Sequence, residues 1–245
     1  MPEIIVGKNP VLEALRAGRP LNKILLARNI RNDPVVAQIL SQARNRGIPV
    51  EFVDRQAVDR LSPGGVNQGV LAYAAAKDYV TLEDLLAIPA SKGEAALFCI
   101  LDGIEDPMNL GAILRTAGAT GVQGVIVRSR RAVGLTSIVA KASAGAIEYV
   151  PVARVVNIAE TIETLKKNNI WVTGIDMDGK TDFEKVDFKL PSAIVVGGEG
   201  KGLSPLVKKR CDTIARISMK GQIASMNASV AAALVMYAAF RQRSR

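Results

Sequence analysis

The sequence predicts an α/β protein in two parts, and three observations support this fold class. Short apolar, strand-like runs alternate with helix-like patterns along most of the 245 residues, and such alternation is typical of a sheet covered by helices. The pattern weakens over residues 77–94, where Pro89 and Ser91-Lys-Gly93 act as breakers and indicate a linker. The hydrophobic content of 49% and the charged content of 22% suit a chain that buries a core.

Residues 1–76 are expected to form a small α/β domain. Asn9-Pro10 fits a helix start with proline in the first turn, and Gly47 fits a helix end. The expected strands cover 3–6, 21–27, 48–53 and 69–73, and the expected helices cover 10–18, 34–46 and 55–61, with a turn at 62–65.

Residues 95–245 are expected to form a larger domain around a parallel sheet covered by helices. Its expected strands cover 97–101, 121–127, 147–152, 170–175 and 193–196, and a helix covers 158–167. The last helix, over 230–240, is apolar nearly all round. It therefore needs cover on several sides, which favours a position in the core or at a dimer interface.

Composition narrows the classes of function. The net charge of +9 and the pI near 9.7 favour a polyanionic partner. The chain has no histidine, which removes the usual zinc ligand and the usual general base near neutral pH. Cys99 and Cys211 lie far apart in the sequence, so we expect reduced thiols rather than a disulfide or a metal site. No apolar run reaches the roughly 18 residues that span a bilayer, and the first residues do not read as a signal peptide, so a cytoplasmic location is expected.

Three segments place small or polar residues at corners between a strand and a helix, where a ligand can bind. They are Asn109-Leu-Gly-Ala-Ile-Leu-Arg115, Gly197-Gly-Glu-Gly-Lys-Gly202 and Ser225-Met-Asn-Ala-Ser-Val230. The glycine-rich segment is not a P-loop, because Gly202 follows Gly-Lys where serine or threonine is required, and it does not fit GxGxxG either.

Each segment also has a purely structural explanation. The glycines suit a tight turn, and Asn109 and Ser225 each suit the N-cap or loop position at the start of a helix. Arg115 stands in an otherwise apolar stretch, so we expect it to be buried or half-buried and paired with an anion, either Glu199, an aspartate or a ligand phosphate.

Together the segments resemble the three signature motifs of the SpoU (TrmH) family of RNA ribose 2′-O-methyltransferases, within the SPOUT superfamily. The matching stretches are 101–117, 194–203 and 217–230, with a further similar stretch at 141–146, so the resemblance covers residues 95–245. It implies S-adenosylmethionine as cofactor, no metal, a homodimer and a deep trefoil knot in the parallel-sheet domain. It also implies a catalytic set, Arg115, Asn109, Glu199, Ser225 and Asn227, and a cofactor-binding set, Gly197, Gly198, Ile217 and Met226.

The first domain resembles the substrate-binding domain of the longer SpoU enzymes, which is similar in fold to ribosomal proteins that bind kink-turn RNA. The matching pieces are 7–15 and 68–70. Asn67 and Met108 depart from the family, which usually has histidine at these two positions. The resemblance implies an RNA substrate, a guanosine of 23S rRNA first. The alternatives are tRNA or a non-catalytic role in RNA binding or ribosome assembly.

The resemblance implies that Arg115 activates the target 2′-hydroxyl. A guanidinium group is almost always protonated, so it is a very poor base. A charged Arg115 can instead hold a phosphate and stabilise the developing alkoxide. The sequence leaves both roles open.

Overall fold

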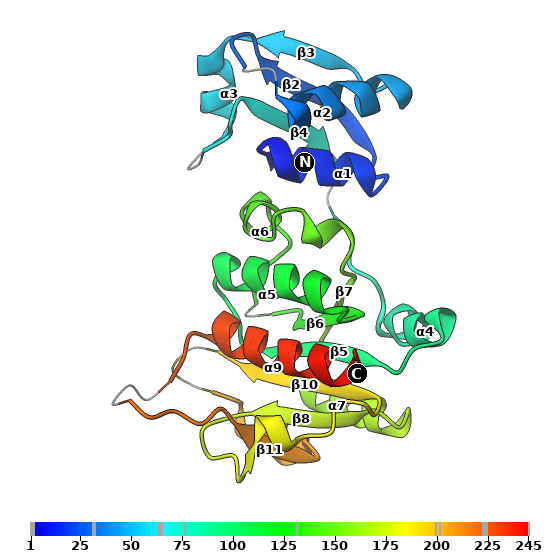
Figure 1. Ribbon diagram of the computed structural model, residues 1–245, viewed down its shortest axis with the longest axis vertical. Helices are drawn as coiled ribbons and strands as arrows, with labels where there is room; N and C mark the ends of the chain where they lie inside the picture. Colours follow the sequence, from blue (N-terminus) through cyan, green and yellow to red (C-terminus); the bar gives the residue numbers. More distant parts are fainter. Residues whose placement is uncertain are drawn as a thin grey trace. The chain divides into compact units, whose positions relative to one another are not determined.

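The chain divides into two compact units in the computed structural model shown in Figure 1. Unit 1 comprises Met1–Asp78 and Gly134–Tyr149, and unit 2 comprises Tyr79–Val133 and Val150–Arg245. The structure describes residues 3–30, 33–62, 66–75, 77–130, 132–198, 200, 202–221 and 225–244.

Unit 1 contains a four-stranded sheet with the order β1-β4-β2-β3, in which only β2 and β3 pair in parallel. Helices cover both faces: Val11 and Ile39 lie in a core cluster on one face, and Val58 packs with Leu25 and Leu71 on the other. The elements are β1 (Glu3–Val6), α1 (Lys8–Arg16), β2 (Leu21–Ala27), α2 (Pro34–Asn45), β3 (Val50–Val53), α3 (Arg55–Leu61) and β4 (Val70–Ala74). They agree with the predicted elements to within about two residues at most ends, as is usual for helix and strand boundaries; the predicted turn at 62–65 falls mostly outside the described residues.

The segment Gly134–Tyr149 packs on the N-terminal residues, although the sequence predicts a strand over 147–152 as part of the second domain. It forms α6 (Ser137–Ala142) and a single 3₁₀ turn, η1 (Ala146–Glu148). Gly145 allows this approach, because a Cβ there would lie 2.4 Å from Cβ of Glu13 and its φ of +89° is strained for other residues. Ile147 is fully buried.

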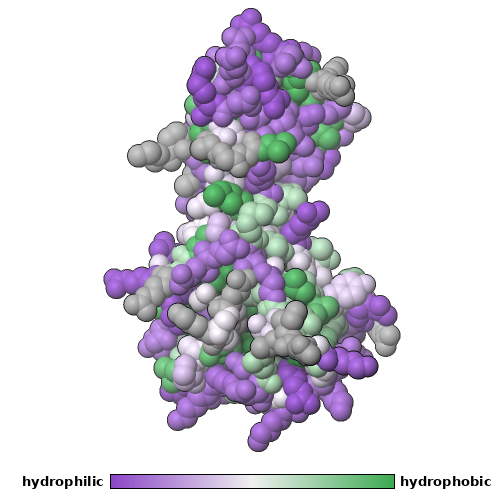
Figure 2. Space-filling model, turned by 90° about the vertical axis from the view of Figure 1, so that its left-hand side faces the viewer, coloured by the Kyte–Doolittle hydropathy of each residue, from purple (hydrophilic) through white to green (hydrophobic). Residues whose placement is uncertain are grey.

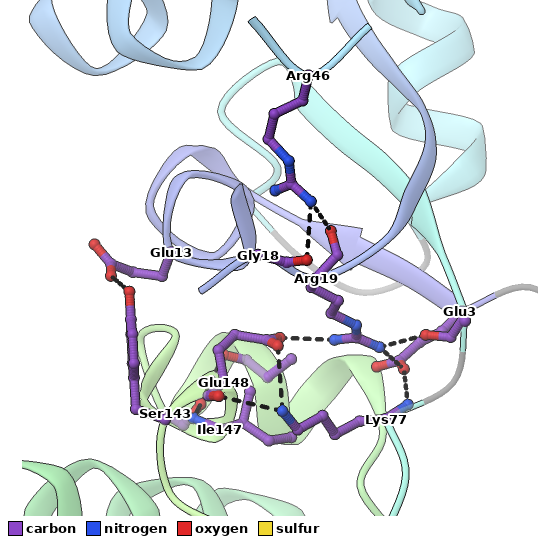
Figure 3. A network of polar contacts seen from close by, with 12 residues as sticks. Glu3, Glu13, Gly18, Arg19, Arg46, Lys77, Ser143, Ile147 and Glu148 are labelled. Atoms are coloured by element: carbon purple, nitrogen blue, oxygen red, sulfur yellow. Dashed lines mark hydrogen bonds and ion pairs between the residues drawn. The ribbon is translucent and has the colours of Figure 1, made fainter. Parts of the chain in front are cut away.

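A network of charged groups holds this segment in unit 1 (Figure 3). The guanidinium of Arg19 donates to Oε1 of Glu148 at 2.7 Å, to Oε2 of Glu3 at 2.5 Å and to the carbonyl of Ala75 at 2.6 Å. Lys77 donates to the carbonyl of Glu148 at 3.2 Å. The side chains of Arg19 and Glu148 are only 6% and 2% exposed, so this is an ion pair away from solvent.

Unit 2 is built on a seven-stranded sheet with the order β7-β6-β5-β10-β8-β11-β9, in which every pairing is parallel. The central strand is β10, where Ile194 lies opposite Cys99 on one side and Thr173 on the other. The strands are β5 (Leu97–Asp102), β6 (Gly124–Arg128), β7 (Val152–Val155), β8 (Trp171–Ile175), β9 (Thr181–Asp182), β10 (Ser192–Gly197) and β11 (Thr213–Arg216). The predicted α/β class and the predicted parallel sheet are therefore both confirmed.

Helices cover both faces of this sheet. Three helices pack on one face, where they contribute Leu85, Ile162 and Val207 to the same core cluster. Two further helices lie side by side on the other face (Figure 1). The first three are α4 (Leu82–Lys92), α7 (Ile158–Lys167) and α8 (Pro205–Arg210), and the last two are α5 (Pro107–Thr120) and α9 (Ala228–Arg243). No helix among the described residues is long and apolar enough to cross a membrane.

The predicted linker over 77–94 contains the helix α4. A capping box between Thr81 and Asp84 starts this helix, and it ends at Gly93. The buried residues of this helix are Leu85 and Pro89. Because so few of its positions are buried, the sequence of the helix shows only a weak apolar periodicity. Pro89 therefore lies inside a helix, where the sequence predicts a break.

Candidate active site

Unit 2 has a pocket of about 590 Å³ beside the carboxyl ends of β8 and β10. The carboxyl ends of parallel strands meet at one edge of the sheet, which is where α/β proteins commonly bind ligands. The pocket is lined by Ile175, Asp176, Met177, Asp178, Val196, Gly197, Gly198, Gly200, Gly202, Leu203, Pro205, Lys208, Ile217, Met219, Ser225, Met226, Ala228 and Ala231. All four residues of the predicted cofactor-binding set are in this lining.

The glycine-rich segment forms a tight loop, in which backbone atoms lie so close together that there is no room for a side chain at two positions. A Cβ on Gly197 would lie 2.2 Å from the carbonyl carbon of Gly202, and one on Gly198 would lie 2.4 Å from the carbonyl oxygen of Gly103. The amide of Gly198 donates to the carbonyl of Asp102 at 3.0 Å, which ties this loop to the end of β5. Gly197 and Gly198 are therefore required by the fold itself. Glu199, which belongs to the predicted catalytic set, lies outside the described residues.

The third segment forms another wall of the pocket. Ser225 and Met226 line it and are exposed. The N-cap of α9 is Asn227, not Ser225 as expected, because Oδ1 of Asn227 accepts hydrogen bonds from the amides of Ser229 at 2.9 Å and Val230 at 3.3 Å. Ser225 is thus left outside the helix, in the pocket wall.

Asn109 connects the first and third segments. Its Oδ1 accepts a hydrogen bond of 2.9 Å from Nδ2 of Asn227. The expected N-cap position of Asn109 is wrong: the N-cap is Asp106, whose carboxylate accepts hydrogen bonds from the amides of Met108 and Asn109. Asn109 therefore lies in the first turn of α5, and its side chain is buried against the start of α9.

Arg115 is exposed on α5 and does not line the pocket of its own chain. The expectation of a buried or half-buried arginine is therefore wrong. Leu114 and Ala117 are buried, but each residue of a helix turns by about 100° from the one before, so an arginine between apolar neighbours can still point to solvent.

The structure adds three charged pocket residues that the sequence analysis missed: Asp176, Asp178 and Lys208. Nζ of Lys208 lies 3.0 Å from Oδ1 of Asp176 and 2.7 Å from Oδ2 of Asp178. Burial alone would raise the pKa of Asp176, but the hydrogen bonds from Lys208 and from two backbone amides outweigh it and hold this pKa below its usual value. The sequence offered one indication of Asp176: it directly follows the predicted strand 170–175, and polar residues at the end of a parallel strand are often part of a site.

Neither cysteine lines this pocket. Cys99 and Cys211 are both free, and burial raises the pKa of each thiol to about 12. In the part of the chain that the structure describes, no three cysteine, aspartate or glutamate side chains group as a metal site.

Comparisons with known proteins place this geometry in a family. Residues 96–237 match the SpoU rRNA Methylase family, and residues 4–80 match the family described as RNA 2′-O ribose methyltransferase substrate binding. YacO of Bacillus subtilis, named for the TrmH family of tRNA/rRNA methyltransferases, is 45% identical over 242 residues, which is 99% of this chain and 96% of YacO.

Solved structures agree with the sequence comparisons. The SpoU methyltransferase AviRb from Streptomyces viridochromogenes, crystallised with the cofactor AdoMet, is 26% identical with a TM-score of 0.82, covering 99% of this chain and 91% of AviRb. A solved RNA 2′-O ribose methyltransferase is 28% identical with a TM-score of 0.81, covering 99% of this chain and 89% of that one. The chain therefore belongs to the SpoU rRNA methylase family: it is an RNA methyltransferase, and its cofactor is S-adenosylmethionine.

Proposed function

We propose that the chain methylates a ribose 2′-hydroxyl of structured ribosomal RNA, at a guanosine of the 23S molecule. The observation that carries methyl transfer is the pocket of unit 2, which brings the second and third segments together next to the hydrogen bond between Asn227 and Asn109. The choice of a guanosine in 23S rRNA rests on the resemblance of the motifs. The matched substrate-binding family is described by its 2′-O ribose chemistry, which supports the hydroxyl as the target. Transfer RNA is the second candidate, because the family name of YacO covers both RNA types.

The pocket suits S-adenosylmethionine in size and lining. Its volume of about 590 Å³ lies within the range of roughly 300–1,000 Å³ typical of small-molecule sites. Gly197 and Gly198 offer backbone without side chains, and Ile217 and Met226 offer apolar contacts for an adenosyl group. When bound there, the cofactor supplies an electrophilic methyl group.

The chain's own residues would hold the RNA and remove a proton. As the 2′-oxygen bonds to the methyl carbon, the bond from that carbon to sulfur breaks and the hydroxyl proton must leave. In a chain without histidine, a carboxylate or water would accept this proton; we assign the role to Glu199 because the family resemblance places it in the catalytic set. Ser225 and Asn227 would orient the ribose, and Asn109 would hold Asn227 in place through their hydrogen bond. Arg115 would hold the adjacent phosphate and stabilise the developing negative charge.

A homodimer is part of this proposal. On α9 the large side chains of Val230, Leu234, Tyr237 and Phe240 are at least 36% exposed, and a contiguous apolar surface favours association with another chain. Arg115 lies outside the pocket of its own chain, so a two-fold pair can supply it to the pocket of the second copy.

We also propose that residues 1–76 bind the RNA, that residues 95–245 transfer the methyl group without a metal, and that the protein works in the cytoplasm. Figure 2 shows a mostly hydrophilic surface over unit 1.

Mixing two inactive variants tests the shared site. Arg115→Ala keeps an intact pocket, whereas Ala231→Phe keeps Arg115 and fills the pocket, since Ala231 lines it. Mixed dimers should regain part of the parental activity, because one of their two sites combines the intact pocket with an intact arginine. A mixture that stays inactive, although mixed dimers form, contradicts a site built from two copies.

The choice of RNA is tested with labelled S-adenosylmethionine and unmodified RNA. Ribosomal and transfer RNA fractions from the same cells are incubated separately with the full-length protein. Label is expected in 23S rRNA, and nuclease mapping then locates the nucleotide. Label only in the tRNA fraction would favour the second candidate, and no label in either fraction would favour a non-catalytic role.

A further inference from the structure

The short turn after β8 forms one wall of the pocket. Asp176, Met177 and Asp178 all line it, and Met177 is 57% exposed. The turn closes with a hydrogen bond of 3.1 Å from the amide of Gly179 to the carbonyl of Asp176. The adjoining wall comes from the glycine-rich loop and the start of α8. The shape of the pocket therefore depends on how these two walls are held against each other.

Asp176 and Lys208 provide the side-chain ties between the walls. Oδ2 of Asp176 accepts a hydrogen bond of 3.3 Å from the amide of Leu203, and its Oδ1 accepts one of 3.0 Å from Nζ of Lys208. Nζ of Lys208 also donates to Oδ2 of Asp178 at 2.7 Å. One ammonium group thus bridges both ends of the turn and attaches it to α8.

The ion pairs of Lys208 are expected to contribute to the stability of the pocket, because two of the three side chains are partly buried. The side chain of Asp176 is 13% exposed and that of Lys208 is 28% exposed, so water screens their attraction less than it screens a surface pair. Asp178 is 78% exposed and forms an ion pair with Lys208. Without the ammonium group, Asp176 would be a poorly hydrated carboxylate held by backbone amides alone, and the two acidic side chains would repel each other.

We propose that Lys208 is a positioning residue for the cofactor. By bridging Asp176 and Asp178 it holds the turn against the glycine-rich loop, so that the pocket is preformed for the adenosyl part of S-adenosylmethionine. The inference rests on the proposed location of the cofactor in this pocket. A preformed pocket lowers the ordering cost of binding, so Lys208 acts on cofactor affinity and much less on the transfer step.

Calorimetry on the full-length protein tests this role with S-adenosylmethionine as the probe. Lys208→Met keeps most of the side-chain volume and removes the charge, and Lys208→Arg restores a cation that can bridge two carboxylates. Lys209→Met is the matched control, because Lys209 is on the same helix but is exposed and outside the pocket lining. Ala231→Phe tests whether the cofactor occupies the pocket at all.

Lys208→Met should raise the Kd for S-adenosylmethionine roughly tenfold, which is about the effect of losing one charge-assisted hydrogen bond. The cofactor concentration that gives half the maximal rate should rise by a similar factor, and the maximal rate should change much less. Lys208→Arg should recover most of the affinity, and Lys209→Met should match the parent.

Two results would overturn the role of Lys208 while leaving the proposed function standing. One is a Lys208→Met protein that binds as tightly as Lys209→Met, and the other is a Lys208→Arg protein as weak as Lys208→Met. If the parent does not bind, or if Ala231→Phe binds as tightly as the parent, the proposed cofactor site itself is wrong and the inference falls with it.

Discussion

Replacing Arg19 with methionine should destabilise unit 1 severely. The substitution keeps an unbranched apolar stem but removes the guanidinium that serves Glu148, Glu3 and the carbonyl of Ala75. The carboxylates of Glu148 and Glu3 are 2% and 10% exposed, so water cannot easily replace the lost partner. Burial alone would lower the pKa of Arg19, but the charges and hydrogen bonds of Glu148 and Glu3 outweigh it and raise this pKa, so Arg19 keeps its charge at any ordinary pH.

The size of the effect follows from what remains after the substitution. Breaking a buried ion pair from one side typically costs about 3–5 kcal/mol. Glu148 keeps Lys77, whose Nζ lies 3.6 Å from its Oε2, so we expect the lower end, about 3 kcal/mol. Arg16→Met is the control: its pair with Glu13 is exposed, and such pairs are worth below about 1 kcal/mol.

Hydrogen exchange measured by mass spectrometry is the appropriate assay, because the two units can unfold separately. Peptides from 3–27 and from 134–149 should lose protection together in Arg19→Met, since the network joins these two stretches. Peptides from the core strands of unit 2 should change little. Equal protection in Arg19→Met and Arg16→Met would refute the reasoning, and so would a loss confined to residues 3–27.

Three further predictions concern unit 2. Arg115→Lys should slow single-turnover methylation on the order of a hundredfold at unchanged cofactor affinity, because lysine lacks the planar fork that holds a phosphate; a rate within a few-fold of the parent would reduce Arg115 to a general positive charge. Asn227→Ala should cost about 1–2 kcal/mol in urea unfolding, because it removes the cap of α9 and the bond to Asn109; Asn227→Asp should retain the cap. Cys99 and Cys211 should not react with a thiol reagent at pH 8 until the protein is denatured, because a pKa of about 12 leaves almost no thiolate; rapid labelling of the native protein would contradict this.

The strongly periodic elements were predictable from the sequence. The helix predicted over 158–167 has those bounds in the structure, and the strands over 3–6 and 21–27 are also confirmed. The strand β11 (Thr213–Arg216) was missed because it is short and carries no long apolar run. The family resemblance of the three segments is confirmed. The trefoil knot implied by that resemblance stays a prediction.

The features that the sequence did not reveal depend on contacts between distant residues. Glu148 joins unit 1 through Arg19, which is 129 residues away in the chain, and no local pattern records such a partner. Lys208 meets Asp176 across 32 residues, so the charged wall of the pocket was also invisible. The position of Arg115 was misjudged for a different reason, because residues next to each other in a helix face different sides.

The chemical position of the transferred methyl group tests the central claim most directly. Unmodified 23S rRNA is incubated with the full-length protein and labelled S-adenosylmethionine, and the RNA is then hydrolysed in alkali. Alkaline cleavage requires a free 2′-hydroxyl, so a 2′-O-methylated nucleotide survives within a dinucleotide. The proposed function predicts that the label is recovered in an alkali-resistant dinucleotide, and that Ala231→Phe produces none. Label recovered in single nucleotides would mean that a base is methylated, and would contradict ribose methylation by this site.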